Sequence, residues 1–152
     1  MVIKTNILID KEEYQQAILE HLKNNNNYQI RSYDYNYDTN RAMDTSLLLK
    51  FLYNTQKDKI EQLVEIYKND TDEVIINYIN NTIINNGLLN VLKHGVYFGS
   101  GIKLDLMYKK PVNNLNKEFN LKYSENILSV MKDVYNKENE PLDFVIFLNG
   151  LT

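Results

Sequence analysis

One carboxylate stands in an apolar stretch near the end of this chain of 152 residues. Asp143 is the only charged residue in the run Leu142–Leu148, whose composition is typical of a strand buried on both faces. A lone buried carboxylate is costly to ionise, so it becomes protonated or binds a cation. A carboxylate near the start of a strand, facing another on a neighbouring strand, can hold Mg²⁺ for phosphodiester hydrolysis. Residue chemistry alone leaves two readings of Asp143: a metal ligand, or a half-solvated residue at the strand mouth after Pro141.

The dipeptide Asn149-Gly150 directly follows this strand, and Asn-Gly is a strong signal for a two-residue β-hairpin turn. Such a turn calls for a returning strand, which would cover the open edge of the strand before it. Only Leu151 and Thr152 follow the turn in this sequence. We therefore expect a sheet that is incomplete at its C-terminal hairpin, with the missing strand beside Asp143. We also expect that two copies can dimerise through the open edge.

The composition limits the class of protein. A hydrophobic fraction of 43% with 24% charged residues is typical of one globular domain, here residues 1–152. The absence of cysteine excludes disulfides and thiolate catalysis. The formal charge of −3 means that the chain lacks the overall positive charge typical of proteins that bind nucleic acid. A local basic strip stays possible. Because no signal peptide or membrane-spanning run is evident, the sequence predicts a cytoplasmic protein without a membrane partner.

The first half of the chain has helical periodicity. We expect helices over residues 10–23, 46–52, 57–68 and 72–85, the first capped by Asp10 and ended by the asparagine run 24–27. Asp44, Thr45 or Ser46 caps the second helix, and Gly87 ends the fourth. The tyrosine-rich stretch 33–40 is interpreted as a short strand or an irregular loop.

The second half changes to the pattern of strands. Alternation over residues 102–107 predicts a half-buried strand, and further strands are expected over residues 126–135 and 142–148. The stretch 116–124 is expected to be a linker or a short helix. Helices followed by strands in one domain predict an α/β fold of the mixed α+β kind.

Several segments of the chain resemble one known family. Leu142–Leu151 closely resembles the signature at the nuclease centre of the restriction (R) subunits of type I restriction-modification enzymes, where a strand and turn of the form (L/I)DLVLFLNGLP lead into a strand ending in Glu-x-Lys. In that family the two elements complete a PD-(D/E)xK site. Further segments resemble the same family in the same order: Tyr37-Asp38 with Ala42–Asp44, Leu47–Leu52 with Thr55-Gln56, Gly87–Gly95, Ile102–Pro111, and Asn126 with Val130 and Val134.

The resemblance implies that the chain is the N-terminal part of an R-subunit nuclease domain, with helices preceding a restriction-endonuclease-like sheet. Asp143 would be the catalytic residue and the metal ligand for Mg²⁺ that this chain retains, because the Glu-x-Lys element is expected beyond Thr152. ATP would act only in the motor domains of the family. This sequence contains no Walker A loop, so those domains are not expected in it. The implied partners are DNA and the modification and specificity subunits. With half of the site missing, the chain by itself is expected to be inactive.

The departures from the family pattern matter as well. Gln15 stands where the family often has an acidic residue, although Glu12, Glu13 and Glu20 lie nearby, and Lys132-Asp133 replaces an Arg-Gln pair. The candidates for contacts with the DNA backbone are four lysines, which solvated surface positions explain equally well: Lys103, Lys109, Lys110 and Lys132. The alternative interpretation is a stand-alone, non-catalytic protein-binding or DNA-binding remnant of a broken R-subunit gene.

Overall fold

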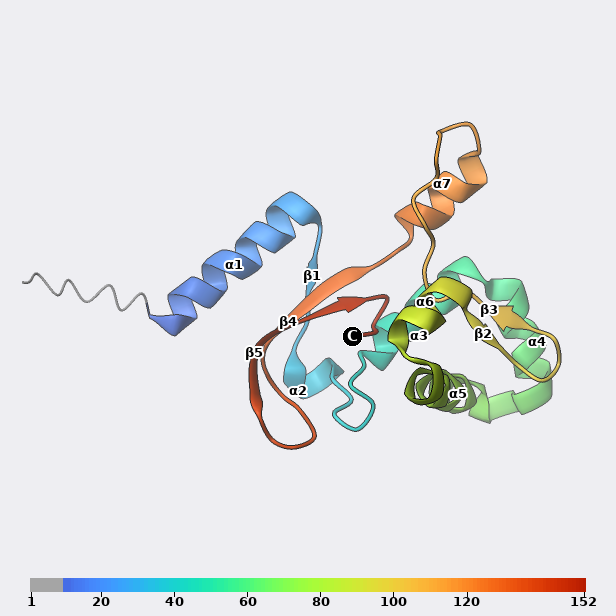
Figure 1. The fold of residues 1–152 in the computed structure, drawn as a ribbon, viewed down its shortest axis with the longest axis horizontal. Coiled ribbons are helices and arrows are strands. Elements are labelled where there is room, and N and C mark those ends of the chain that lie inside the picture. Colours follow the sequence, from blue (N-terminus) through green and yellow to red (C-terminus); the bar gives the residue numbers. More distant parts are fainter. Residues whose placement is uncertain (1–9) are drawn as a thin grey trace, which may run out of the picture.

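The computed structural model describes residues 10–152, which form a mixed α/β fold (Figure 1). A three-stranded sheet has the order β1-β4-β5, and a two-stranded sheet pairs β2 with β3. The strands of the larger sheet are β1 (Gln29–Ile30), β4 (Leu128–Tyr135) and β5 (Pro141–Leu148). β1 runs parallel to β4, and β5 runs antiparallel to it. The fold class expected from the sequence is therefore confirmed at the level of a mixed α/β architecture.

The helical half supplies most of the core. Its elements are α3 (Thr45–Thr55), α4 (Lys57–Tyr67), a 3₁₀ turn (Lys68–Asp70), α5 (Thr71–Asn86) and α6 (Leu88–His94). Asp44 caps α3 by accepting a hydrogen bond from the backbone N–H of Leu47, and α5 ends at Gly87, where φ is +83°. These caps confirm two of the predicted helix ends. The apolar faces of these helices enclose fully buried side chains: Leu48, Phe51, Leu52, Ile60, Leu63, Ile75 and Ile79.

A smaller apolar cluster lies between the larger sheet and α2 (Tyr33–Asn36). Tyr33 and Tyr37 pack against the buried side chains of Met131 and Phe147 from β4 and β5. The expectation of a strand or loop over the tyrosine-rich stretch is wrong at its start, because these tyrosines anchor a single helical turn over the sheet. Over so short a stretch, the spacing of the tyrosines does not distinguish a helical turn from an extended segment.

β5 is not buried on both faces, contrary to the prediction. Val145 and Phe147 are buried, whereas Ile146 between them is 50% exposed. β5 lies at the end of the strand order, beyond β4, and α1 (Lys11–Asn26) extends along only part of the sheet (Figure 1). A continuous apolar run therefore marks here an edge strand with one buried face, whose outer edge has no partner strand within residues 10–152.

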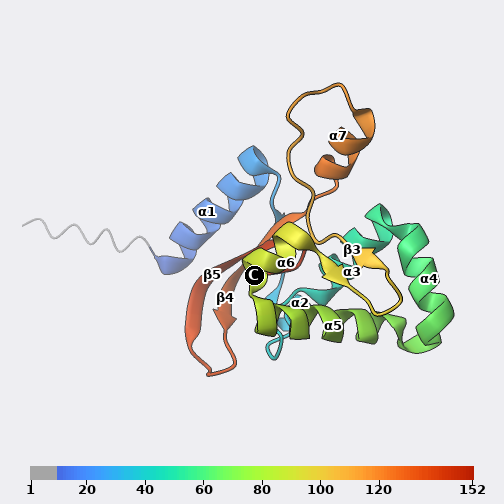
Figure 2. The ribbon, with the colours of Figure 1, turned by 45° about the vertical axis from the view of Figure 1, so that its right-hand side comes forward.

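Two further elements differ from the sequence-based expectation, and a third matches one of its two alternatives. α1 continues through the asparagine run to Asn26 and ends where Asn27 adopts φ +57°, and the cap Asp10 accepts from Glu12 N–H. The strand expected over residues 102–107 shrinks to β3 (Lys103–Leu104), because its partner β2 (Val96–Tyr97) is equally short. α7 (Lys117–Ser124) is the short helix allowed for the linker region, and it projects from the rest of the molecule in Figures 1 and 2. In the described part of the chain, no helix has the length and apolar character needed to cross a membrane.

Candidate functional site

The turn after β5 has the geometry that Asn-Gly predicts. Asn149 and Gly150 both have positive φ, at +52° and +81°, as the central residues of a type I′ turn require. The backbone N–H of Leu151 donates to Leu148 O at 3.0 Å, and Leu148 N–H donates back to Leu151 O at 2.9 Å. The predicted two-residue hairpin turn is therefore confirmed. Leu151 then pairs with Met43, so the start of the returning segment lies beside the segment that leads into α3.

The side chain of Asn149 is fully buried and ties this turn to two other segments. Its amide group donates to Leu106 O at 2.9 Å and to Asn126 Oδ1 at 3.0 Å. Its Oδ1 accepts a hydrogen bond from Ile127 N–H at 2.6 Å. Because every polar atom of this side chain is paired in a dry environment, the contacts fix both the direction and the register of the turn.

Gly150 lies against the start of α3 at a distance that no larger residue allows. A Cβ atom at this position would stand 2.3 Å from Asp44 O and 2.7 Å from Leu48 N. Gly150 O accepts a hydrogen bond from Asp44 N–H at 2.9 Å, and the buried carboxylate of Asp44 is paired with Arg31, whose Nε lies 2.8 Å from Oδ2. The turn thus joins the segments that carry the family resemblance, and these segments hold β5 in place.

Asp143, the principal candidate residue, lies on β5 with its side chain 71% exposed. Of the two interpretations left open by the sequence, its environment is the solvated one. Lys132 pairs with Phe144 and Val134 with Leu142, so Asp133 lies opposite Asp143 on the neighbouring strand. The Asp133 side chain is 48% exposed, and its φ is +51°. Two carboxylates therefore face each other across β4 and β5, an arrangement that destabilises a sheet unless a cation intervenes.

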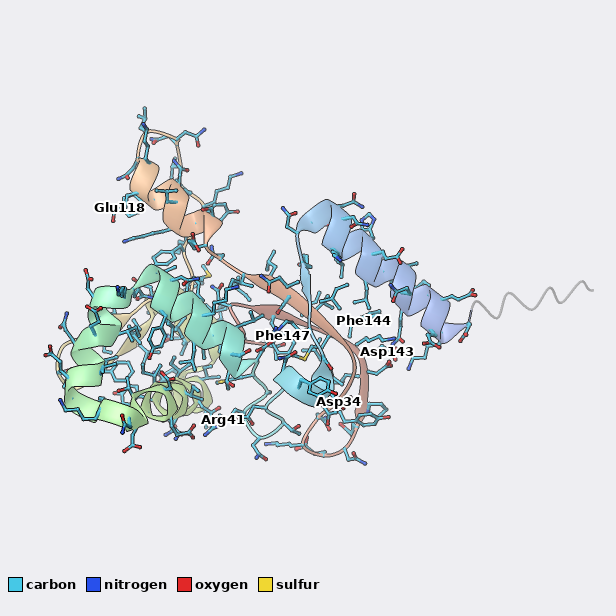
Figure 3. All side chains as sticks on the ribbon, turned by 180° about the vertical axis from the view of Figure 1, so that it is seen from behind. Asp34, Arg41, Glu118, Asp143, Phe144 and Phe147 are labelled. Carbon is cyan, nitrogen blue, oxygen red and sulfur yellow. The ribbon has the colours of Figure 1, made fainter. Side chains whose placement is uncertain are left out.

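Lys11, the first residue of α1, supplies that cation. Its Nζ lies 2.9 Å from Asp143 Oδ1 and 3.5 Å from Asp133 Oδ1. The hydrogen bond and charge of Asp143, followed by the charge of Asp133, raise the pKa of Lys11. Figure 3 shows Asp143 and Phe144 on the stretch of β5 that lies beside α1, with Phe147 further along the strand. We call Lys11, Gln15, Asp133 and Asp143 the acidic-pair site.

Gln15 completes the acidic-pair site from the buried face of α1. Its amide donates to Asp133 Oδ1 at 2.9 Å and to the backbone O of Asp143 at 3.3 Å. The hydrogen bond from Gln15, together with the charge of Lys11, lowers the pKa of Asp133. Where the family has an acid, this chain thus has a neutral donor that contacts Asp143. The three nearby acids Glu12, Glu13 and Glu20 are exposed on α1.

The donor set of the acidic-pair site fits Mg²⁺ in kind, since Mg²⁺ takes one or two carboxylates and fills its other positions with water and substrate phosphates. The two facing carboxylates of Asp133 and Asp143 are the residues that would hold it. Within residues 10–152 no group of three or more acidic, histidine or cysteine side chains stands ready to hold a metal ion. The ion would therefore be weakly held, with Lys11 as a competing cation.

The four candidate lysines are not brought together. Lys132 lies on β4 next to Asp133, one position from the acidic pair. Lys103 is engaged by Asp105, 3.0 Å away, whose hydrogen bond raises the pKa of Lys103. Lys109 and Lys110 lie together after β3 and line two cavities beside α7. Only Lys132 is therefore close to Asp143 in the fold.

Sequence reasoning missed two members of the acidic-pair site, Lys11 and the role of Asp133. Asp133 was visible in the sequence only as one of two adjacent charges, beside Lys132, which is a weaker signal than the lone charge of Asp143. Lys11 carried no such signal, because a lysine in the first turn of an exposed helix is ordinary. Comparisons of the chain with protein-family models, with curated proteins and with solved structures found no match.

Proposed function

We propose that this chain is the N-terminal part of a PD-(D/E)xK nuclease domain of a type I restriction R subunit, with a restriction-endonuclease-like sheet and Asp143 as a ligand for Mg²⁺. Its substrate would be DNA, and its partners the modification and specificity subunits. The observation that carries the proposal is the turn at Asn149-Gly150, which contacts three other segments of the family resemblance, at Asp44, Leu106 and Asn126.

A chance resemblance would have no reason to place those segments in contact. Two of the buried polar residues of the resemblance, Asp44 and Asn149, hold the end of β5 against the helical core. They are separated by more than a hundred positions in the chain, yet Asp44 N–H donates to Gly150 O. Their shared task is to position the strand that carries Asp143, as a catalytic carboxylate on a rigid element requires.

Each member of the acidic-pair site has a role in this proposal. Asp143 and Asp133 would hold the ion, which supplies a metal-activated water and stabilises charge on the scissile phosphate. Gln15 orients the Asp133 carboxylate by donating to it from a buried position. Lys11 offsets the repulsion between the two carboxylates, and its ammonium can also contact a phosphate of the substrate. The Glu-x-Lys element of the family is not among these 152 residues.

A titration with Mn²⁺ in place of Mg²⁺ tests the metal site in this chain directly. Paramagnetic broadening of the backbone amide signals of ¹⁵N-labelled protein should begin at residues near Asp143 and Asp133 and should disappear in Asp143→Asn. The matched control is Asp34→Asn, an exposed carboxylate on α2 (Figure 3), which should leave the broadening unchanged. Broadening that starts elsewhere, or that persists in Asp143→Asn, would contradict the proposal.

A plasmid assay tests the nuclease assignment. The chain alone should not cleave supercoiled DNA with Mg²⁺ or Mn²⁺, because one acidic pair lacks the further family ligands. A chain extended after Thr152 by a strand ending in Glu-x-Lys should nick the plasmid, and Asp143→Asn should abolish the nicking. A Gln-x-Met extension is the matched control. Cleavage by the unextended chain that disappears in Asp143→Ala would overturn the prediction of inactivity, and an inactive Glu-x-Lys extension would argue against the nuclease.

A further inference from the structure

Two adjoining cavities of about 570 and 690 Å³ open beside α7. Both are lined by the segment that follows β3, with Met107, Tyr108, Lys109 and Lys110 common to the two. We call the combined feature the α7 groove. One end is formed by Asn26 and the cap residue Asn27 of α1, and the other by Phe119 and the loop before α7. None of these residues belongs to the acidic-pair site.

The α7 groove is basic although the chain as a whole carries a net charge of −3. Lys109 and Lys110 are exposed and form no ion pair with any described residue. The only acid that lines the groove is Asp105, and Lys103 neutralises it at 3.0 Å. Lys122 pairs with Glu118 at 3.1 Å. The free positive charge of the groove is therefore concentrated on two adjacent lysines.

Aromatic side chains lie next to these lysines. Phe119 and Tyr123 both line the groove and are both partly exposed, although they come from an amphipathic helix with little to cover it. The backbone of Tyr108 is held by Asn126, which accepts a hydrogen bond from its N–H at 3.1 Å and donates to its O at 2.7 Å. The groove thus places exposed aromatic rings beside free cations.

We propose that the α7 groove binds single-stranded DNA, with phosphates on Lys109 and Lys110 and unpaired bases stacked on Phe119 and Tyr123. Free lysines beside exposed aromatic rings are the combination that binds single strands, since each unpaired base has a face to stack. A duplex has no free base faces to offer these rings, and an acidic peptide would leave them without partners. The choice of DNA rests on the proposed function. The groove and the acidic-pair site lie near opposite ends of α1, a helix about 24 Å long.

Fluorescence anisotropy with a labelled oligothymidine of about twelve nucleotides tests this inference. EDTA in the buffer removes any contribution of metal at Asp143. We expect the charge reversal Lys109→Glu/Lys110→Glu to weaken binding at least about tenfold and to reduce the salt dependence, by about 1.4 in the slope of log K against log salt for two phosphates. Tyr123→Ala should weaken binding about fivefold or more through lost stacking.

Matched variants separate the groove from general charge and aromatic effects. Lys93→Glu/Lys137→Glu changes the net charge equally at two exposed lysines that do not line the groove, and Tyr35→Ala removes an exposed tyrosine of α2; both should bind like the parent chain. Circular dichroism verifies that each variant is folded. Equal weakening by the two charge reversals would overturn the inference.

Three further outcomes would also overturn the inference: a duplex bound as tightly as the single strand, effective competition by polyglutamate, and a matching RNA bound in preference to DNA. Loss of groove binding while Mn²⁺ broadening at Asp143 persists would leave the proposed function standing, so the two proposals fail separately.

Discussion

The side-chain amide of Asn149 donates to Asn126 Oδ1 at 3.0 Å, which joins the turn after β5 to the segment that enters β4. Asn126 in turn holds both backbone polar groups of Tyr108. A chain of three residues thus connects the end of the strand that carries Asp143 with the wall of the α7 groove. One partly buried polar network therefore links the end of β5 to the groove, and variants in that network test both contacts.

Replacing Gly150 by alanine should destabilise the protein strongly. Alanine at φ +81° costs about 1–2 kcal/mol, and the new Cβ would collide with Asp44 O and Leu48 N, adding about 1–3 kcal/mol. Gly101→Ala is the matched control, because Gly101 has the same φ and no atom within 4 Å of the added Cβ. Urea unfolding should therefore show a clearly larger loss for Gly150→Ala. Equal losses would mean that the turn does not pack against α3 as described.

Replacing Asn149 tests its hydrogen bonds. Asn149→Ala leaves the buried Leu106 O and Ile127 N–H without partners and should cost about 2–4 kcal/mol. Asn149→Asp places a carboxylate against two acceptor oxygens, which should raise the pKa of the new acid. Because the folded state then binds the proton more tightly than the unfolded state, this variant should gain stability as the pH falls.

A urea series from pH 7 to pH 4 measures that trend for Asn149→Asp. Asn114→Asp in the exposed loop before α7 is the control and should show no such gain. Stability of Asn149→Asp that falls with pH in parallel with the control would contradict the buried network.

Removing Arg31 alone should destabilise the protein, because it leaves the buried carboxylate of Asp44 without its ion-pair partner. Asp44 is fully buried, so Arg31→Met leaves a buried carboxylate with only the Leu47 N–H and Ser46 Oγ as donors and should cost about 3 kcal/mol. Arg31→Met/Asp44→Asn should recover part of the loss. The exposed pair of Lys57 and Glu61 provides the control, since Lys57→Met should change the free energy of unfolding by less than about 0.5 kcal/mol. No difference between the two single variants would contradict the burial of Asp44.

Local chemistry made part of this fold predictable. Asn-Gly specified the turn, because both central positions need positive φ and these two residues tolerate it. Asp44 and Gly87 marked helix ends for similarly local reasons. Alternation over Ile102, Leu104 and Leu106 correctly predicted three buried side chains. The same alternation overestimated the length of β3, because a strand needs a partner strand along its length and β2 is only two residues long.

The acidic-pair site could not be predicted because it depends on contacts between distant segments. Gln15 and Asp133 lie 118 positions apart, and no periodicity in either segment refers to the other. The prediction that β5 is buried on both faces was wrong for a related reason. An apolar run shows which side chains are hydrophobic, but it does not show how many neighbouring elements cover the strand. The sequence left open whether Asp143 is a metal ligand or a solvated residue at the strand mouth, and its solvated environment follows from the position of β5 at the sheet edge.

Asp133 should contribute to stability at neutral pH and lose that contribution in acid. The Gln15 hydrogen bond and then the Lys11 charge lower the pKa of Asp133 below its usual value of 3.8. A carboxylate with a depressed pKa in the folded state stabilises the fold above its unfolded pKa, and this stabilisation is lost as the pH falls through the folded pKa. Asp133→Asn should therefore be less stable than the parent at pH 6 and should lose less stability between pH 4 and pH 2.5.

Urea unfolding across that pH range measures the effect, with Glu65→Gln on the exposed face of α4 as the control. Lys11→Met isolates the role of the ammonium. Without it, Asp133 and Asp143 repel each other across the strands, so this variant should be destabilised most at neutral pH and approach the parent as the carboxylates become protonated. An unchanged acid slope in Asp133→Asn, or a Lys11→Met deficit that is independent of pH, would show that the ammonium does not bridge the two carboxylates in solution.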